Sequence, residues 1–376
     1  MAVPEIRFKG FTDAWTQRKV VDIAPLQRGF DLSKSEMIGG DYPVVMSNGI
    51  LYHHNEFKAK APGVVTGRSG TIGKLHFVEV DYWPHNTALW VTDFMGNFPK
   101  FIYHLYDELD LSRFGTGTGV PTLNRNDVHN ENIRIPCFAE QQKIATFMDV
   151  LDDLIAATQR KVAGLKQLKA AYLQQMFPQD GEKVPRVRFG GFSGDWEVRK
   201  ADEIFLSISD KNHGSLPVLS ASQERGMVLR DEIGIDIKFD KANTATYKRV
   251  LPGQFVIHLR SFQGGLAYAG IEGITSPAYT VLDFIDKDAQ MPEFWVDILK
   301  SENFIKMLES VTYGIRDGRS ISFNDFSMLK LSFPSQAEQV AIGNFFLNID
   351  VQIKTQSEKM EKLKQIKAAY LQKMFA

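Results

Sequence analysis

The sequence contains an internal repeat, and this feature constrains the fold more than any other. The chain opens with a motif that recurs 181 residues later. Its matched positions are Pro4, Arg7, Phe8, Gly10, Phe11, Trp15, Arg18, Lys19 and Ile23 in the first copy and Pro185, Arg188, Phe189, Gly191, Phe192, Trp196, Arg199, Lys200 and Ile204 in the second. A repeat this long indicates a duplicated structural unit. We therefore expect two related globular segments in the 376-residue chain.

A second pair of matches closes each half. Ala139-Glu140-Gln141 matches Ala337-Glu338-Gln339, and Lys169–Phe177 matches Lys367–Phe375, both at an offset of 198 residues without a gap. The two offsets, 181 and 198, place 17 extra residues in the second globular segment. The stretch between the closing matches keeps its length, which suggests that this length matters to function.

Both closing stretches lack proline, and their apolar residues follow the 4,3 spacing of a coiled coil. Each predicted seam is apolar except at two equivalent places, Thr158 and Lys169 in the first helix and Gln356 and Lys367 in the second. The seam positions are Ile144, Met148, Leu151, Ile155, Thr158, Val162, Leu165, Lys169, Tyr172 and Met176, and then Ile342, Phe346, Ile349, Ile353, Gln356, Met360, Leu363, Lys367, Tyr370 and Met374.

The connectivity predicts that the two helices pack antiparallel. The first helix leads through a short polar linker into the second globular segment, and the second helix starts at that segment's far end. The expected fold is α+β: two β-rich globular domains separated by a long antiparallel two-helix coiled coil, with pseudo-two-fold symmetry. The expected boundaries are 1–138 for the first domain, 139–177 for the first spacer helix, 178–336 for the linker and second domain, and 337–376 for the second spacer helix.

Full antiparallel overlap would place Thr158 opposite Gln356, because each lies at the middle of its helix. We predict that this pair forms a central polar layer that helps to set the register. The alternative is that both positions are incidental and solvated.

The globular segments are predicted to be strand-rich, with short β-branched and aromatic runs separated by Gly, Pro, Asn and Asp. The expected strands correspond in order, and a helix is expected near the end of each segment. The strands are 42–46, 63–66 and 87–91 in the first half and 216–219, 254–258 and 279–282 in the second, and the helices are 98–111 and 291–311.

Two loops in each half are candidates for contacting DNA. They combine glycine, which allows close approach of the backbone, with side chains that contact phosphates and base edges. The alternative is ordinary glycine turns with solvated tips. The candidate residues are Arg68, Ser69, Lys74, Thr116, Thr118, Asn124 and Arg125 in the first half, and Arg260, Ser261, Gln263, Tyr313, Arg316, Arg319, Ser320 and Asn324 in the second.

Several other classes of site are disfavoured. No catalytic motif is visible, and His53, His54 and His85 lack Cys or carboxylate partners at metal-ligand spacing. A single cysteine cannot form an internal disulfide, and no signal peptide or membrane span is evident, so we expect a cytoplasmic protein. The net charge of −1 means that any DNA contact must use local clusters of charge or a partner's basic surface.

The whole chain resembles the specificity subunit of type I restriction-modification enzymes. The resemblance rests on the opening motifs at Pro4 and Pro185, the Ile-Arg-Ile-Pro and Leu-Ser-Phe-Pro stretches before Glu140 and Glu338, and the helices that end at Phe177 and Phe375. It implies a DNA-binding, non-catalytic subunit whose two domains each bind one part of a bipartite duplex site. The implied partners are two modification subunits, which bind S-adenosylmethionine, and two restriction subunits, which use ATP and magnesium.

A spacer argument can be made from helix geometry. About 38 helical residues span roughly 57 Å, an upper bound of about 17 base pairs between domain centres. Domains on one face of DNA should engage about one turn, roughly 10 base pairs, apart, which leaves an unread gap of roughly six or seven. Two other functions remain open at this stage: a coiled-coil scaffold that binds two protein ligands without DNA specificity, and a stand-alone nuclease or methyltransferase, against which the missing motifs argue.

Overall fold

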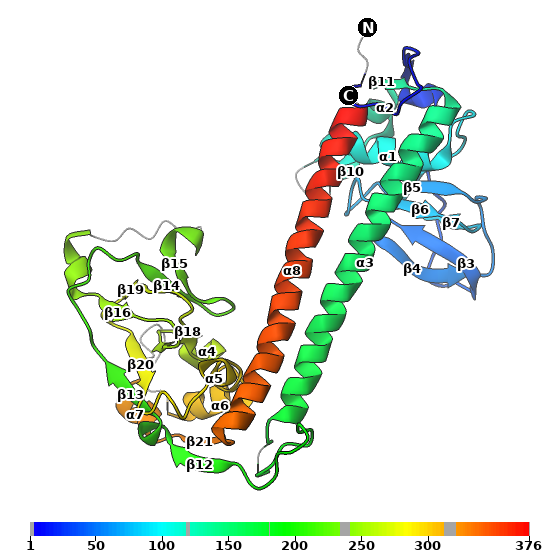
Figure 1. Ribbon diagram of the computed structural model, residues 1–376. Helices are drawn as coiled ribbons and strands as arrows, with labels where there is room; N and C mark the ends of the chain where they lie inside the picture. Colours follow the sequence, from blue (N-terminus) through cyan, green and yellow to red (C-terminus); the bar gives the residue numbers. More distant parts are fainter. Residues whose placement is uncertain (1–3, 118–120, 180, 234–240, 312–320, 376) are drawn as a thin grey trace. The chain divides into compact units, whose positions relative to one another are not determined.

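The computed structural model describes residues 4–117, 121–179, 181–233, 241–311 and 321–375 (Figure 1). The chain divides into two compact units, residues 1–160 with 357–376 and residues 161–356. Each unit therefore contains one globular segment and part of both long helices, α3 (Phe138–Met176) and α8 (Gln336–Phe375). This division cuts across the helices, whereas the sequence-based boundaries follow helix ends.

Unit 1 is built around a four-stranded antiparallel sheet in the order β2-β8-β5-β6. Its central strand β5 is Gly-Val-Val-Thr-Gly, buried at all five positions, which suits β-branched side chains packed on both faces. A second sheet has the order β4-β3-β7, and two short pairs are β1-β11 and β9-β10. The elements are β1 Thr16–Lys19, η1 Val20–Asp22, β2 Leu26–Arg28, β3 Gly39–Met46, β4 Gly49–His54, β5 Gly63–Gly67, β6 Leu75–Val78, β7 Trp83–Pro84, β8 Ala88–Val91, α1 Pro99–Glu108, η2 Leu111–Phe114, β9 Gly115–Thr116, β10 Thr122–Leu123, α2 Arg125–His129 and β11 Asn132–Ile135.

Unit 2 repeats this plan around the sheet β13-β20-β17-β18. The pair β12-β21 corresponds to β1-β11, and the hairpin β14-β15 follows the first sheet strand as β3-β4 does in unit 1. The elements are β12 Glu197–Lys200, η3 Ala201–Glu203, β13 Phe205–Ile208, β14 Leu219–Ser222, β15 Gly226–Leu229, η4 Arg230–Ile233, η5 Lys241–Thr246, β16 Lys248–Val250, β17 Phe255–Ile257, α4 Ser261–Gly264, β18 Ala267–Tyr268, β19 Gly273–Thr275, β20 Thr280–Phe284, α5 Pro292–Ile298, α6 Glu302–Ser310, α7 Phe323–Ser327 and β21 Lys330–Phe333.

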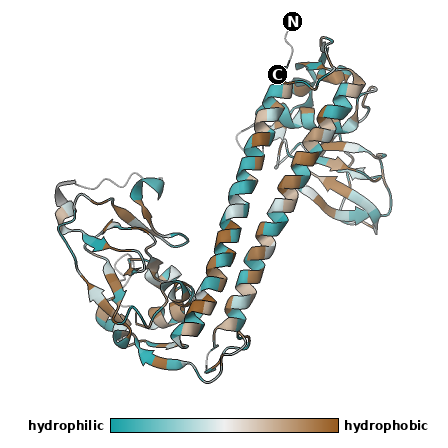
Figure 2. Ribbon diagram, in the orientation of Figure 1, coloured by the Kyte–Doolittle hydropathy of each residue, from teal (hydrophilic) through white to brown (hydrophobic). Residues whose placement is uncertain are grey.

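Both long helices contribute to the hydrophobic core of each unit. In unit 1, Ile144 and Met148 of α3 and Met374 of α8 are buried with strand and α1 residues. In unit 2, Phe346 of α8 and Met176 of α3 are buried in the core in the corresponding way. Apolar and polar residues alternate along both helices (Figure 2). Burial of one large apolar side chain contributes about 1.5–3 kcal/mol to stability. Because several core side chains of each unit come from α3 and α8, neither globular segment has a complete core without these helices.

The opening motif attaches each globular segment to the helices in the same way. Arg7 makes a two-point ion pair with Glu140, with N···O distances of 2.8 and 2.7 Å. Arg188 does the same with Glu338, at 2.7 and 2.7 Å. The carboxylates are buried and lie in the first turn of their helices, where a negative charge is favoured. The Arg and Glu that recur in the two repeats are therefore partners.

Aromatic contacts strengthen the same attachment. Phe8 packs edge-on against Phe147 of α3, which in turn contacts Tyr370 of α8 with ring centroids 4.9 Å apart. Phe189, Phe345 and Tyr172 form the equivalent triplet in unit 2. In both units the start of one long helix thus lies against the end of the other, so the two helices run antiparallel within each unit.

The repeated glutamine joins the helix start to the neighbouring domain helix. Gln141 accepts a hydrogen bond from the backbone nitrogen of Phe98, just before α1, and donates to the Pro136 carbonyl. Gln339 does the same with Met291, just before α5, and with Pro334. The opening motif, the Ala-Glu-Gln turn and the helix ends form what we call the shared frame. It consists of residues 4–23, 136–160 and 357–375 in unit 1 and of residues 185–204, 334–356 and 161–177 in unit 2.

The structure differs from the sequence-based expectation in three elements. The helix expected over 291–311 is two helices, α5 and α6, because Ser301 caps a new start by accepting from the Phe304 nitrogen. The helix expected over 98–111 ends at Glu108 and is followed by a 3-10 turn. The strand expected over 216–219 starts only at Leu219, where pairing with Leu229 of β15 begins, whereas Val218 forms an isolated bridge with Ile274.

The predicted seam positions are all buried or half-buried along α3 and α8. Thr158 donates its hydroxyl hydrogen bond to the Leu154 carbonyl in its own helix, at 2.7 Å. Thr158 lies in unit 1 and Gln356 in unit 2, so their proposed pairing stays a prediction. No helix within the described residues is long and apolar enough to cross a membrane.

We predict that Glu140→Gln lowers the free energy of unfolding of unit 1 by about 2–4 kcal/mol, because it leaves the Arg7 guanidinium without its buried counter-charge. Urea unfolding of the purified protein measures this loss. Glu358→Gln, at an exposed position of α8, is the control and should change the free energy by less than about 0.5 kcal/mol. Equal stability of the two variants would show that the ion pair is dispensable.

Candidate nucleic-acid interface

The first candidate loop of unit 1 is a tight turn between β5 and β6. The Gly67 nitrogen donates to the Lys74 carbonyl, and the Gly73 nitrogen donates to the Gly67 carbonyl, both at 3.0 Å. A Cβ at Gly67 would overlap the Thr71 carbonyl oxygen, so this glycine is required by the turn itself. The turn presents Arg68 and Ser69, both half-buried, at the end of the central strand.

The second candidate loop of unit 1 packs directly on the first. The Leu123 nitrogen donates to the Arg68 carbonyl at 2.8 Å, and Ser69 forms a β-bridge with Thr122. Thr116 is exposed on the short β9-β10 pair, and Thr118 lies outside the described residues. The structure therefore brings together two loops whose contacting residues, Arg68 and Leu123, are 55 positions apart in sequence.

The side chains of the other candidates in unit 1 have different surroundings. Lys74 is exposed, and its ammonium group donates to the Asn48 carbonyl at 2.8 Å. Asn124 caps α2 by accepting from the Asn126 nitrogen at 3.0 Å, which gives it a structural role. Arg125, at the first position of α2, is exposed.

Two further loops, which the sequence analysis did not single out, meet at the same edge of unit 1. The Thr87 carbonyl accepts hydrogen bonds from the backbone nitrogens of both Arg68 and Ser69, at 2.9 and 3.1 Å. The Thr87 hydroxyl accepts from the Ser47 nitrogen and lies 2.9 Å from the His85 Nδ1. Both segments are short polar turns between strands, Ser47-Asn48-Gly49 and His85-Asn86-Thr87. Their polar, turn-forming composition could have marked both segments as candidate loops. Only the structure shows that they lie beside the loop that contains Arg68.

The corresponding loops of unit 2 occupy equivalent places. The turn Arg260–Gly265 follows β17, and Gly264 packs against Gln223 of the β14-β15 hairpin. Arg260 and Gln263 are exposed, whereas Ser261 is 0% exposed and its hydroxyl accepts from the His258 nitrogen. In this conformation Ser261 holds the turn in place and is not at the surface.

His258 supports the same turn. Burial, opposed in part by a backbone hydrogen bond, lowers the pKa of His258 to about 4, so the ring is neutral at neutral pH. A neutral Nδ1 can accept a hydrogen bond, and the Arg260 nitrogen lies 3.3 Å from it. The buried His258 ring therefore holds the backbone at Arg260, while the Arg260 side chain is exposed to solvent.

The second candidate loop of unit 2 is only partly described. Asn324 is exposed in α7, and its carbonyl accepts from the Ser327 hydroxyl at 2.7 Å. Tyr313, Arg316, Arg319 and Ser320 lie outside the described residues.

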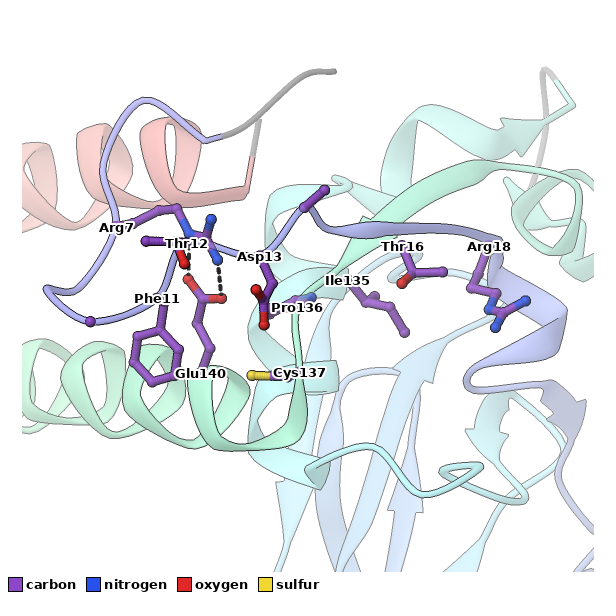
Figure 3. Close-up of a pocket in the computed structure, with 12 residues that line it drawn as sticks. Arg7, Phe11, Thr12, Asp13, Thr16, Arg18, Ile135, Pro136, Cys137 and Glu140 are labelled. Atoms are coloured by element: carbon purple, nitrogen blue, oxygen red, sulfur yellow. Dashed lines mark hydrogen bonds and ion pairs between the residues drawn. The ribbon is translucent and has the colours of Figure 1, made fainter.

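A polar pocket of about 330 Å³ lies in the shared frame of unit 1, beside the Arg7–Glu140 ion pair (Figure 3). Asp13 and Cys137 line the same pocket. Unit 2 has the equivalent pocket, about 450 Å³, beside Arg188 and Glu338. The frame thus presents the same surface feature twice, while the loops of the two units differ in sequence.

The described residues contain no group of three His, Cys, Asp or Glu side chains arranged to bind a metal ion. The chemistry that the two loop edges offer is hydrogen bonding from backbone amides and short polar side chains, with a few cationic groups. Such groups contact phosphates and base edges.

Comparison with known proteins finds sequence similarity to a family model and to a curated relative. The family model described as type I restriction modification DNA specificity domain matches residues 12–167. Over 271 residues the chain is 26% identical to the type I restriction enzyme MjaVIII specificity subunit of Methanocaldococcus jannaschii. The alignment covers 67% of this chain and 63% of that protein.

Solved structures share the fold. The S subunit of a type I restriction-modification system from M. genitalium superposes with a TM-score of 0.68 at 15% identity, covering 100% of this chain and 99% of that one. A chain from a study of complex assembly and conformational transition of the type I R-M system has a TM-score of 0.51 at 16% identity, covering 97% and 98%. These likenesses show that the chain has the fold of the solved specificity subunits, and residues 12–167 also match the specificity-domain family model in sequence.

Proposed function

We propose that this chain recognises a bipartite DNA site, with one globular domain for each half-site, as the specificity subunit of a type I restriction-modification complex. The observation that carries the proposal is the contrast between the shared frame, which is repeated contact for contact, and the loop edges, which differ between the units. Two domains that share one frame but carry different loops are expected to bind a site whose two halves differ in sequence.

The loop edge of unit 1 supports DNA as the ligand. Four turns meet there, and they offer an arginine, a lysine and several hydroxyl and amide groups within one patch, Arg68, Ser69, Lys74, Thr87 and Thr116. These are residue types that bind base edges in the major groove and phosphates along the DNA backbone. The net charge of −1 implies that partner subunits supply part of the phosphate contact.

The shared frame supports recruitment of partners in pairs. It occurs twice with the same ion pair, aromatic triplet and pocket, so a protein that binds one copy can bind the other. We propose two modification subunits and two restriction subunits as these partners. S-adenosylmethionine, ATP and magnesium would be bound by those subunits, and this chain would supply sequence recognition without catalysis.

Mapping methylated adenines in a cell that expresses this chain with its modification subunits tests the proposal. We expect a single motif made of two short defined parts separated by a fixed undefined gap. One continuous motif would contradict the two-domain reading. If no methylation and no duplex binding occur with those subunits, the scaffold function without DNA specificity would be favoured.

We predict that Arg68→Ala changes recognition of one half-site only. Loss of a direct base contact costs about 1–3 kcal/mol, so discrimination at one or two base pairs should fall by roughly five- to 150-fold. Binding to duplexes with single substitutions measures this, and Arg160→Ala, at an exposed position of α3, is the control. A uniform loss of affinity for all duplexes would instead assign Arg68 to a phosphate contact.

We predict that the helices set the gap between the half-sites. Insertion of one heptad into each of α3 and α8, near Thr158 and Gln356, keeps the seam in phase and adds about 10 Å, or roughly three base pairs. Methylation mapping should show a gap widened by that amount with both half-sites unchanged. Insertion into α3 alone breaks the pairing and should abolish activity, and an unchanged gap in the double insertion would refute the spacer role.

A further inference from the structure

Two lysines stand at equivalent places on the apolar seams of the long helices, Lys367 in α8 and Lys169 in α3. Their side chains are only 14% and 19% exposed. A charged group on a helix seam weakens apolar packing, and each lysine loses side-chain freedom when it is held in one geometry. Their surroundings show what offsets this cost.

Lys367 joins three elements of unit 1. Its Nζ lies 2.7 Å from Asp152 of α3 and 3.1 Å from Asp107 of α1. Asp152 also lies 4.0 Å from the buried His104 of α1, and Asp149, one turn away on α3, contacts His104 at 2.9 Å. One ammonium group therefore connects its own helix, the partner helix and the domain helix.

Lys169 makes the same joint in unit 2. Its Nζ lies 2.7 Å from Asp350 of α8 and 3.1 Å from Asp297 of α5, and Asp297 is 8% exposed. At Gly343 of α8 a Cβ would lie 2.9 Å from the Phe294 nitrogen, so α5 lies directly on the long helix here. We call each set a lysine joint: Lys367 with Asp152 and Asp107, and Lys169 with Asp350 and Asp297.

The two lysine joints have the same geometry, although one aspartate of each joint lies outside the ungapped repeat. Asp152 and Asp350 are related by the helix offset of 198, but Asp107 and Asp297 belong to the globular segments, where the lengths differ. Burial lowers the pKa of Lys367, but the hydrogen bond to Asp152 and the charge of Asp107 outweigh this effect and raise it. Both lysines remain charged, because two carboxylates face each of them.

We propose that Lys169 and Lys367 are positioning residues that fix the orientation of each globular domain on the helix pair, and thereby the half-site spacing that the protein accepts. This inference rests on the proposed function. Apolar packing is weakly directional, whereas an ammonium group held between two carboxylates resists rotation of the domain helix about the long helix. The joint therefore supplies angular stiffness that the surrounding core does not.

The most specific variants remove only the contact between each lysine and the aspartate of the globular domain. Asp107→Asn and Asp297→Asn keep the side-chain shape and leave the helix-to-helix pair of each lysine in place. With modification subunits present, methylation is measured on duplexes that keep both half-sites and change the gap by one base pair. We expect preference for the natural gap to fall about tenfold, equal to about 1.4 kcal/mol, with base preference inside each half-site unchanged.

Matched controls separate positioning from general loss of stability. Lys364→Met removes an exposed lysine one turn before Lys367 that pairs with Glu361 on its own helix, and it should keep the natural gap preference. Lys367→Met should broaden the accepted gap as Asp107→Asn does, and Lys367→Arg should restore the preference in part because the charge returns. Wild-type gap preference in Asp107→Asn, Asp297→Asn and Lys367→Met would overturn the proposal.

A measurement without DNA keeps this inference distinct from the proposed function. Spin labels at Asp41→Cys in β3 and Lys362→Cys in α8, both exposed positions of unit 1, report the domain-to-helix distance in a Cys137→Ser background. Asp107→Asn should broaden the distance distribution, and Lys364→Met should not. If the wild-type protein shows no bipartite methylation, the proposed function is wrong, but the distance measurement still tests the positioning role of the lysine joint. If Asp107→Asn does not broaden the distance distribution, the positioning role is wrong and the proposed function is unaffected.

Discussion

Each globular segment of this protein completes its hydrophobic core with residues from both long helices, and the rest of the structure depends on that constraint. Met148 and Met374 in unit 1, and Phe346 and Met176 in unit 2, are core residues and helix residues at once. A change in helix length or phase would therefore disturb the cores as well as the seam. This explains why the ungapped length between the two closing matches is held while the globular segments vary.

Polar contacts add direction to this packing. The Arg7–Glu140 and Arg188–Glu338 pairs seat the opening motif on the first turn of a helix, and the repeated glutamines tie that turn to the next domain helix. The lysine joints add a third fixed point further along the helices. Since a rigid body needs several non-collinear contacts to be fixed, these polar groups can hold a domain at one angle where apolar burial alone would allow sliding.

The loop edges follow a different logic. Their backbone is fixed by contacts such as those of Thr87 with Arg68 and of His258 with Arg260, while outward side chains are free to differ. A scaffold of this kind lets specificity change through a few surface residues without disturbing the core. The division between a constant frame and variable edges is what the proposed function requires of the two units.

The sequence by itself determined the duplication, the helix boundaries to within one residue, and the α+β character, because repeats and 4,3 periodicity are local signals. It also predicted that the two loops of unit 1 matter, but it could not show that they touch. Contacts between Arg68 and Leu123, or between Lys367 and Asp107, join residues far apart in the chain, and spacing holds no information on them. Only the tertiary structure revealed that Ser47 and Thr87 share the loop edge, that Ser261 is buried, and that two seam lysines are joints. In each case the deciding factor is which strands and helices are neighbours, and this arises from packing over the whole unit.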